Sequence, residues 1–121
     1  METANWPTKS GEYKVVQINF DNQPYLRLRK LDADVTHAGI LEDFLRLEAR
    51  IEFETTTSMQ RDIPRKKGER YELVGAGRSE IFMTTQAAWF YGKSFDYGFG
   101  INEEHLHQIK RLGNWSLGIR D

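Results

Sequence analysis

Residues 11–30 read GEYKVVQINFDNQPYLRLRK, and they predict two β-strands joined by a turn. Apolar and polar residues alternate along residues 13–20 and again along residues 25–30, which is typical of strands with one face in a core. The residues between the two strands, Asp-Asn-Gln-Pro at 21–24, are types that favour a turn. This region is therefore expected to build part of a β-sheet.

The hydrophobic pattern changes to that of a helix after residue 36. Apolar residues then recur at three- and four-residue spacing, at Ile40, Leu41, Phe44, Leu45, Leu47 and Ile51. Asp34 or Thr36 can cap the first turn with a side-chain oxygen. We therefore expect this helix to begin close to His37.

The rest of the chain predicts a long loop, four strands and a second helix. Residues 55–70 show no apolar periodicity and predict a basic loop. Strands are predicted at residues 71–74, 80–84, 87–91 and 115–119, with Gly75-Ala76-Gly77 as a turn between the first two. The second helix runs from its cap Asn102 to Gly113, with a buried side at Leu106, Ile109 and Leu112. These segments predict six strands and two helices in one domain, residues 11–121, after a flexible N-terminal segment, residues 1–10.

The composition fits a single domain without a strong overall charge. The chain has 121 residues, with 17 Lys and Arg against 18 Asp and Glu and a net charge of −1. A nearly neutral chain offers no general attraction to nucleic acid or to an anionic membrane, so we expect neither as a partner. The absence of cysteine excludes disulfides and thiolate chemistry. The first residues show no basic segment followed by an apolar run, so we expect a cytoplasmic protein, and we expect it to be a monomer.

His37 is the histidine whose predicted position favours chemistry. The backbone N–H groups at the start of a helix have no partner within the helix and attract anions, and here they include those of Ala38 and Gly39. The positive end of the helix dipole also disfavours an imidazolium, so we expect a neutral ring that can act as a nucleophile or a base. The alternative is that His37 is an ordinary surface residue at a helix start.

Three other motifs have both a functional and a purely structural interpretation. Gly75-Ala76-Gly77-Arg78 lacks the third glycine of a dinucleotide motif, and it is either a simple turn or a turn that presents Arg78 to a phosphate. The loop at residues 91–100 can surround an oxyanion with backbone amides and the Ser94 hydroxyl, or it serves only for packing. The basic run at residues 61–70 is interrupted by acidic residues and lacks aromatic residues for base stacking, which predicts a solvated loop rather than a nucleic-acid interface.

Four segments follow one another along the chain: GEYKVV at residues 11–16, DVTHAGI at 34–40, GAGR at 75–78 and YGKSFDYG at 91–98. Together they resemble the small phosphohistidine phosphatases, which are also called the Janus/Ocnus family. The resemblance runs from about Gly11 to Ile119, which is nearly the whole chain.

The resemblance implies an α/β (α+β) fold in which a mixed β-sheet of about six strands packs with two α-helices. It also implies a phosphatase that hydrolyses phosphohistidine in proteins without a metal ion or another cofactor. The residues that match the family's site are the catalytic histidine His37, the phosphate-binding lysine Lys14, the active-site arginines Arg29 and Arg78, and a phosphate cradle of Ser94 with the backbone amides of Ala38 and Asp96. Proteins that contain phosphohistidine are the substrates implied.

Two features depart from the family pattern. Asp96 stands where the family usually has a small uncharged residue, and its carboxylate repels a phosphate unless it turns away or pairs with Arg29 or Lys93. Residues 55–70 make the chain longer than in related proteins, either as a simple insertion or as a segment that selects acidic or phosphorylated partners. These departures leave a second hypothesis open, a non-catalytic phosphoprotein-binding module with the same phosphate cradle.

Overall fold

The five strands of the main sheet lie in the order β2-β1-β5-β6-β7 in the computed structural model, which describes residues 1–120. They are β1 (Gly11–Phe20), β2 (Gln23–Lys30), β5 (Tyr71–Phe82), β6 (Ala87–Tyr91) and β7 (Ser116–Ile119). Neighbouring strands are antiparallel except β6 and β7, which are parallel. The remaining elements are the hairpin of β3 (Thr55–Ser58) and β4 (Arg61–Pro64), the helix α1 (His37–Asp43) with its π-helical continuation η1 (Phe44–Glu48), and α2 (Glu103–Arg111). The predicted class of fold, a mixed sheet with two α-helices in one domain, is confirmed.

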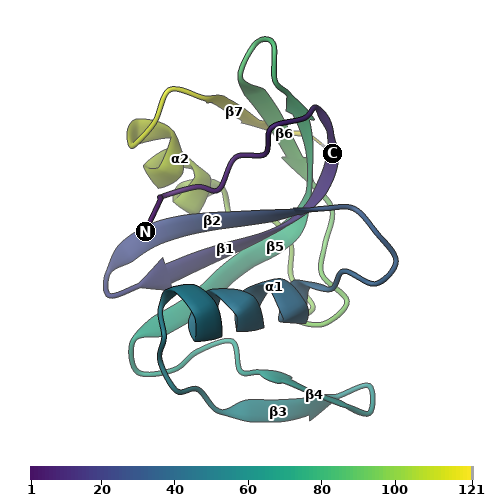
Figure 1. Cartoon of the computed structure of the whole chain (residues 1–121), viewed down its shortest axis with the longest axis vertical. Coiled ribbons are helices and arrows are strands. Elements are labelled where there is room, and N and C mark those ends of the chain that lie inside the picture. Colours follow the sequence, from purple (N-terminus) through teal and green to yellow (C-terminus); the bar gives the residue numbers. More distant parts are fainter. Residues whose placement is uncertain (121) are drawn as a thin grey trace.

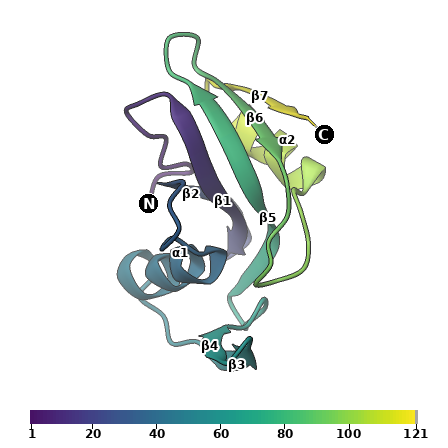
Figure 2. The same ribbon diagram turned by 90° about the vertical axis from the view of Figure 1, so that its right-hand side faces the viewer.

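The two helices cover opposite faces of the main sheet (Figures 1 and 2). One core lies between the sheet and α1 and includes Val16, Ile18 and Leu41. A second core lies between the sheet and α2 and includes Val15 and Leu106. Each side chain buried in this way contributes about 1.5–3 kcal/mol, so both helices are held by the sheet between them. No helix within residues 1–120 is both long and apolar enough to cross a membrane.

Strand β1 is buried on both faces, although its alternating sequence predicts one polar face. Four consecutive side chains are 0 % exposed: Val15, Val16, Gln17 and Ile18. The strand pairs with β2 on one edge and with β5 on the other. A functional residue on β1 is therefore held in place by buried side chains and by a paired strand on each edge.

Strand β5 corrects the prediction of two strands separated by a glycine turn. Residues 71–82 form one continuous strand, and Gly75 and Gly77 lie within it. A Cβ atom at Gly75 would lie 2.1 Å from the Gln17 Oε1 atom, and one at Gly77 would lie 2.5 Å from the Tyr91 carbonyl oxygen. These glycines therefore permit close packing inside the sheet, a role that a turn-like sequence does not reveal.

The prediction of a loop throughout residues 55–70 is also wrong, because residues 55–64 form the β3–β4 hairpin below α1 (Figure 1). Its two turn residues, Met59 and Gln60, have φ values of 50° and 65°. Two consecutive positive φ values are typical of the two-residue turns of hairpins, where asparagine and glycine are the usual residues. A Met-Gln turn carries no such signal in the sequence.

The first helix begins as predicted and ends differently. The Thr36 hydroxyl accepts a hydrogen bond from the Gly39 amide at 2.9 Å, so Thr36 is the cap and His37 the first residue. From Phe44 the helix widens into η1, which changes the angle between successive side chains. Leu47, predicted to be buried, is 63 % exposed for this reason. In α2, Leu112 is also exposed, because it follows the last helical residue.

The N-terminal residues, which we expect to be flexible, lie against β2. The Leu26 amide donates to the Thr3 carbonyl oxygen at 2.8 Å, and the Leu28 amide donates to the Asn5 side chain at 2.7 Å. The Trp6 ring stacks on Trp115 with 4.2 Å between the ring centroids. The flexibility of residues 1–10 stays a prediction about motion.

A buried polar network fixes the start of α2 to the sheet. The Gln17 side chain exchanges two hydrogen bonds with the backbone of Asn102, at 2.8 and 2.9 Å. The His105 ring lies 3.1 Å from the Ile18 carbonyl oxygen through Nε2 and 3.3 Å from the Gln17 amide through Nδ1. The Ile18 carbonyl oxygen only accepts, so Nε2 carries the proton, and the Gln17 side-chain N–H donates to Nδ1, so the ring is neutral.

We expect this neutral ring to make the fold sensitive to acid. Burial lowers the pKa of His105 to about 4, below the 6.5 of an ordinary histidine. The unfolded chain therefore binds more protons between pH 6.5 and 4, and the free energy of unfolding falls by roughly 3 kcal/mol as the pH drops through this window. Urea unfolding at several pH values measures the free energy of unfolding of the wild type and of His105→Gln. Between pH 6.5 and 4 this free energy should fall less in His105→Gln than in the wild type. Parallel curves would contradict it.

Candidate active site

Three basic residues form a row across the sheet on the face covered by α1. Lys14 of β1 lies directly opposite Arg29 of β2 and Arg78 of β5. Side chains directly opposite one another in antiparallel strands point to the same face, and Val16, two residues after Lys14, packs beneath α1. The strand register thus brings together three cations that are distant in the sequence.

His37 is placed over this row by its position as the first residue of α1. The residue is 6 % exposed, and the ring Nε2 lies 2.8 Å from the carbonyl oxygen of Gly77 in β5. Because the carbonyl oxygen only accepts, Nε2 carries the proton and Nδ1 keeps a free lone pair. The structure therefore holds His37 in the tautomer that leaves Nδ1 able to act as a nucleophile or a base.

The charge state of His37 is set by its surroundings. Burial lowers the pKa of the ring below its usual value, and the nearby cations Lys14 and Arg78 lower it further. The hydrogen bond to the Gly77 carbonyl oxygen and the charge of the Asp96 carboxylate raise the pKa of the ring. A neutral ring was expected from the helix dipole, whereas here burial is the main cause.

Lys14 and Arg78 are available to an anion, whereas the side chain of Arg29 is engaged by Asp43. The Lys14 ammonium donates to the Val35 carbonyl oxygen, and neither Lys14 nor Arg78 forms an ion pair with a carboxylate within residues 1–120. Arg29 is instead paired with Asp43, the last residue of α1, about 9 Å along the helix axis from its start. The register thus places Arg29 beside Lys14, but the ion pair with Asp43 holds its side chain at the last residue of α1 and not at His37.

The loop after β6 carries Ser94 and Asp96, and Asp96 contacts the start of α1. Ser94 is 2 % exposed, and its hydroxyl oxygen accepts a hydrogen bond from the Tyr97 amide at 3.3 Å. The Tyr97 hydroxyl donates to the Pro64 carbonyl oxygen of β4 at 2.7 Å, which ties this loop to the hairpin. The loop is therefore fixed at both Ser94 and Tyr97.

Asp96 uses the backbone amide that was expected to hold a phosphate. Its Oδ2 atom accepts a hydrogen bond from the Ala38 amide at 3.0 Å, and its Oδ1 atom is paired with the Arg61 guanidinium. The expected partners Arg29 and Lys93 are not the ones observed. Arg61 was missed as a site residue because it lies on β4, within the segment predicted to be a loop.

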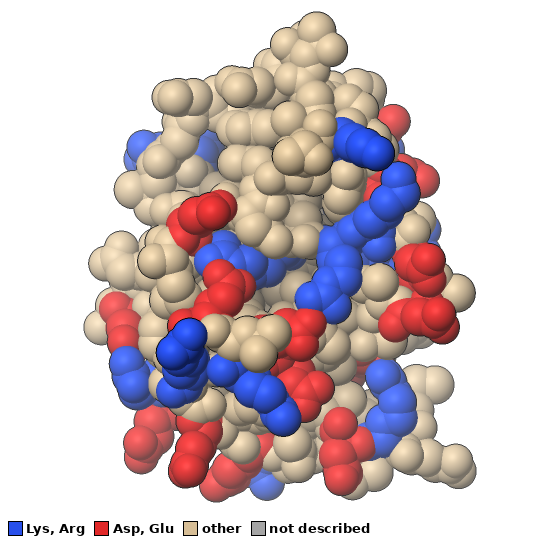
Figure 3. Space-filling view, viewed as in Figure 1, with Lys and Arg blue, Asp and Glu red and all other residues tan. Residues whose placement is uncertain are grey.

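The face that carries α1 has basic and acidic side chains side by side, with basic side chains on both sides of its centre (Figure 3). No group of three His, Cys, Asp or Glu residues among residues 1–120 is placed to hold a metal ion. The arrangement offers a neutral imidazole, two cations that pair with no carboxylate within residues 1–120, and a helix-start amide bound to a carboxylate. These groups can bind an oxyanion and place a nucleophile beside it.

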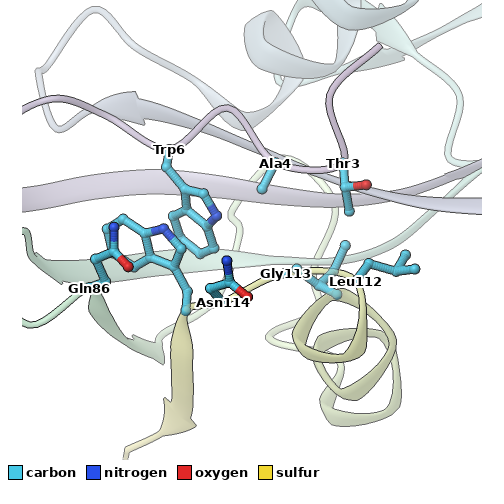
Figure 4. Close-up of a pocket in the computed structure, with 9 residues that line it drawn as sticks. Thr3, Ala4, Trp6, Gln86, Leu112, Gly113 and Asn114 are labelled. Atoms are coloured by element: carbon cyan, nitrogen blue, oxygen red, sulfur yellow. The ribbon is translucent and has the colours of Figure 1, made fainter.

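Two hollows lie elsewhere on the molecule. One, with a volume of about 300 Å³, is lined by the N-terminal segment, the end of α2 and the residues before β7, including Trp6, Leu112 and Trp115 (Figure 4). The other, of about 760 Å³, lies between residues 50–54 and residues 65–71. Neither is lined by His37, Lys14 or Arg78, so the candidate site is separate from both.

A scan against known protein families finds no match for this chain, and a search of curated proteins finds none either.

We predict two opposite changes in the pKa of His37. Lys14→Met removes a cation and should raise the pKa, while Asp96→Asn removes a carboxylate and should lower it. NMR titration of the imidazole nitrogens measures both, and in the wild type it should show a pKa below 6.5 with the proton on Nε2. A wild-type pKa above 6.5, or a proton on Nδ1 in the neutral ring, would contradict this description of the site.

Proposed function

We propose that this protein is a phosphohistidine phosphatase that hydrolyses the P–N bond without a metal ion. The observation that carries the proposal is a His37 ring with its proton on Nε2, near enough to Lys14 and Arg78 for both cations to lower its pKa. A phosphoryl group needs charge neutralisation and a positioned nucleophile, and these residues supply both. The four resembling segments supply the same residues, which adds support from the sequence.

Lys14 and Arg78 would neutralise the phosphoryl oxygens. The hydrogen bond from Lys14 to the Val35 carbonyl oxygen uses one of its three N–H donors and orients the ammonium, so two donors stay available. Arg78 is exposed and can turn its planar guanidinium toward two oxygens at once. The buried Ser94 hydroxyl would add a hydrogen bond from the opposite loop.

His37 would act by one of two routes. In the first, Nδ1 attacks phosphorus, the P–N bond of the substrate breaks, the departing imidazole takes a proton from water, and water later hydrolyses the phosphohistidine formed on His37. In the second, Nδ1 takes a proton from the water that attacks phosphorus, the P–N bond of the substrate breaks, and the departing imidazole takes that proton from His37. Both routes need the neutral ring that burial and the two cations maintain.

We expect each of the two cations to matter for turnover. Lys14→Met and Arg78→Met should each lower kcat/KM for a phosphohistidine peptide by at least roughly tenfold, because each removes charge neutralisation of the phosphoryl oxygens. The matched control is Lys110→Met, which removes an exposed cation from α2. Phosphate release in the presence of EDTA is the measurement. Equal kcat/KM for all three variants and the wild type would contradict the assignment.

One observation favours the second candidate function, a non-catalytic phosphoprotein-binding module. The Ala38 amide is bound to the Asp96 carboxylate and is not free for a phosphoryl oxygen. A binding module predicts that the wild type binds a phosphohistidine peptide while no phosphate is released over many equivalents of substrate. Release of phosphate in excess of the protein would decide against it.

We also propose partners and a cellular location for this protein. Substrates are proteins that carry phosphohistidine, and the absence of cysteine supports a cytoplasmic location. Nucleic acid stays an unfavoured partner because three of the five basic residues in residues 61–70 are used in ion pairs: Arg61 with Asp96, Arg65 with Glu54, and Arg70 with Asp21. A monomer stays our expectation for the oligomeric state.

A further inference from the structure

Asp96 is held at the candidate site from two sides. The Ala38 amide, at the start of α1, donates to Oδ2 at 3.0 Å, and the guanidinium of Arg61 on β4 pairs with Oδ1. The Asp96 side chain is 8 % exposed, whereas that of Arg61 is 44 % exposed. A nearly buried carboxylate is thus bound by two donors that come from segments far apart in the sequence.

This carboxylate occupies a position that an incoming anion would use. One amide hydrogen cannot bond fully to both a carboxylate and a phosphoryl oxygen. In addition, two negative groups that share one amide donor repel each other. The carboxylate is close enough to His37 to affect its protonation, opposing the effect of Lys14 and Arg78. It therefore lies within the same electrostatic environment as the candidate nucleophile.

We propose that Asp96 is an internal ligand of the anion site, held there by Arg61, and that a phosphoryl group must displace it to bind. The inference rests on the proposed function for the identity of the anion. Its consequence is a low affinity for free phosphate, which is also the product of the proposed reaction. A phosphorylated protein can still bind because it contributes contacts beyond its phosphoryl group.

Removing the carboxylate would release two donors at once. Without Asp96, the Ala38 amide and the Arg61 guanidinium are both free to bind an anion. The population of protein competent to bind phosphate then rises, and the apparent affinity rises by the same factor. Because the cost of displacement does not depend on which anion causes it, the gain should be equal for inorganic phosphate and for a phosphohistidine peptide.

The test is a titration with inorganic phosphate, followed by NMR at the backbone amide of Ala38. We expect Asp96→Ala to bind phosphate at least about tenfold more tightly than the wild type. Asp96→Asn keeps an oxygen near the amide and loses the charge, so its affinity for phosphate should lie between those of the wild type and Asp96→Ala. The double variant Asp96→Ala with Arg61→Ala should lose part of this gain in phosphate affinity, because it lacks the Arg61 guanidinium. The matched control is Asp62→Ala, because Asp62 is an exposed carboxylate on the same strand as Arg61 and its side chain contacts only Thr57 among the hydrogen bonds of residues 1–120.

The outcomes separate this inference from the proposed function. Equal phosphate affinity in the wild type, Asp96→Ala and Asp96→Asn would overturn it, and so would the absence of phosphate binding to all of them. Tighter binding by Asp96→Ala without hydrolysis of a phosphohistidine peptide by any form would confirm the internal ligand and contradict the phosphatase. The amide spectrum itself reports whether each variant is folded.

Discussion

The hydrogen bond between the His37 ring and the Gly77 carbonyl oxygen joins the start of α1 to the middle strand of the sheet. It selects the ring tautomer and holds the helix start against β5, close to Lys14 and Arg78. It depends on the absence of a side chain at Gly77, because a Cβ atom there would lie 2.5 Å from the Tyr91 carbonyl oxygen. The geometry of the candidate site thus follows from close packing within β5 and β6.

The site balances opposite charges around a neutral imidazole. Lys14 and Arg78 favour the neutral ring and attract an anion, while Asp96 favours the charged ring and repels an anion. Arg61 keeps Asp96 in place from the β3–β4 hairpin, so a segment outside the main sheet contributes to the electrostatics of the site. The protein's own carboxylate thereby takes the position of the ligand that the site is proposed to bind.

Much of the fold could be predicted from the sequence, because alternation and helical periodicity report directly on burial. The first two strands were predicted on that basis, and the start of α1 and the limits of α2 were predicted from periodicity together with capping residues. Gly75 and Gly77 misled the prediction, because a glycine that permits close packing looks the same as one in a turn. The hairpin turn at Met59 and Gln60 carried no signal. The contact between Asp96 and Arg61 could not be predicted, since it depends on that hairpin.

The central claim is that the neutral ring of His37 carries out metal-free hydrolysis of phosphohistidine. The most direct measurement compares phosphate release from a phosphohistidine peptide, in EDTA, by the wild type, His37→Ala and His107→Ala. His107 is the matched control because it is an exposed histidine on α2, on the opposite face of the sheet. We expect release by the wild type and His107→Ala, and a loss of at least about a hundredfold in His37→Ala. Equal release by all three proteins, or release by none of them when each is folded, would contradict it.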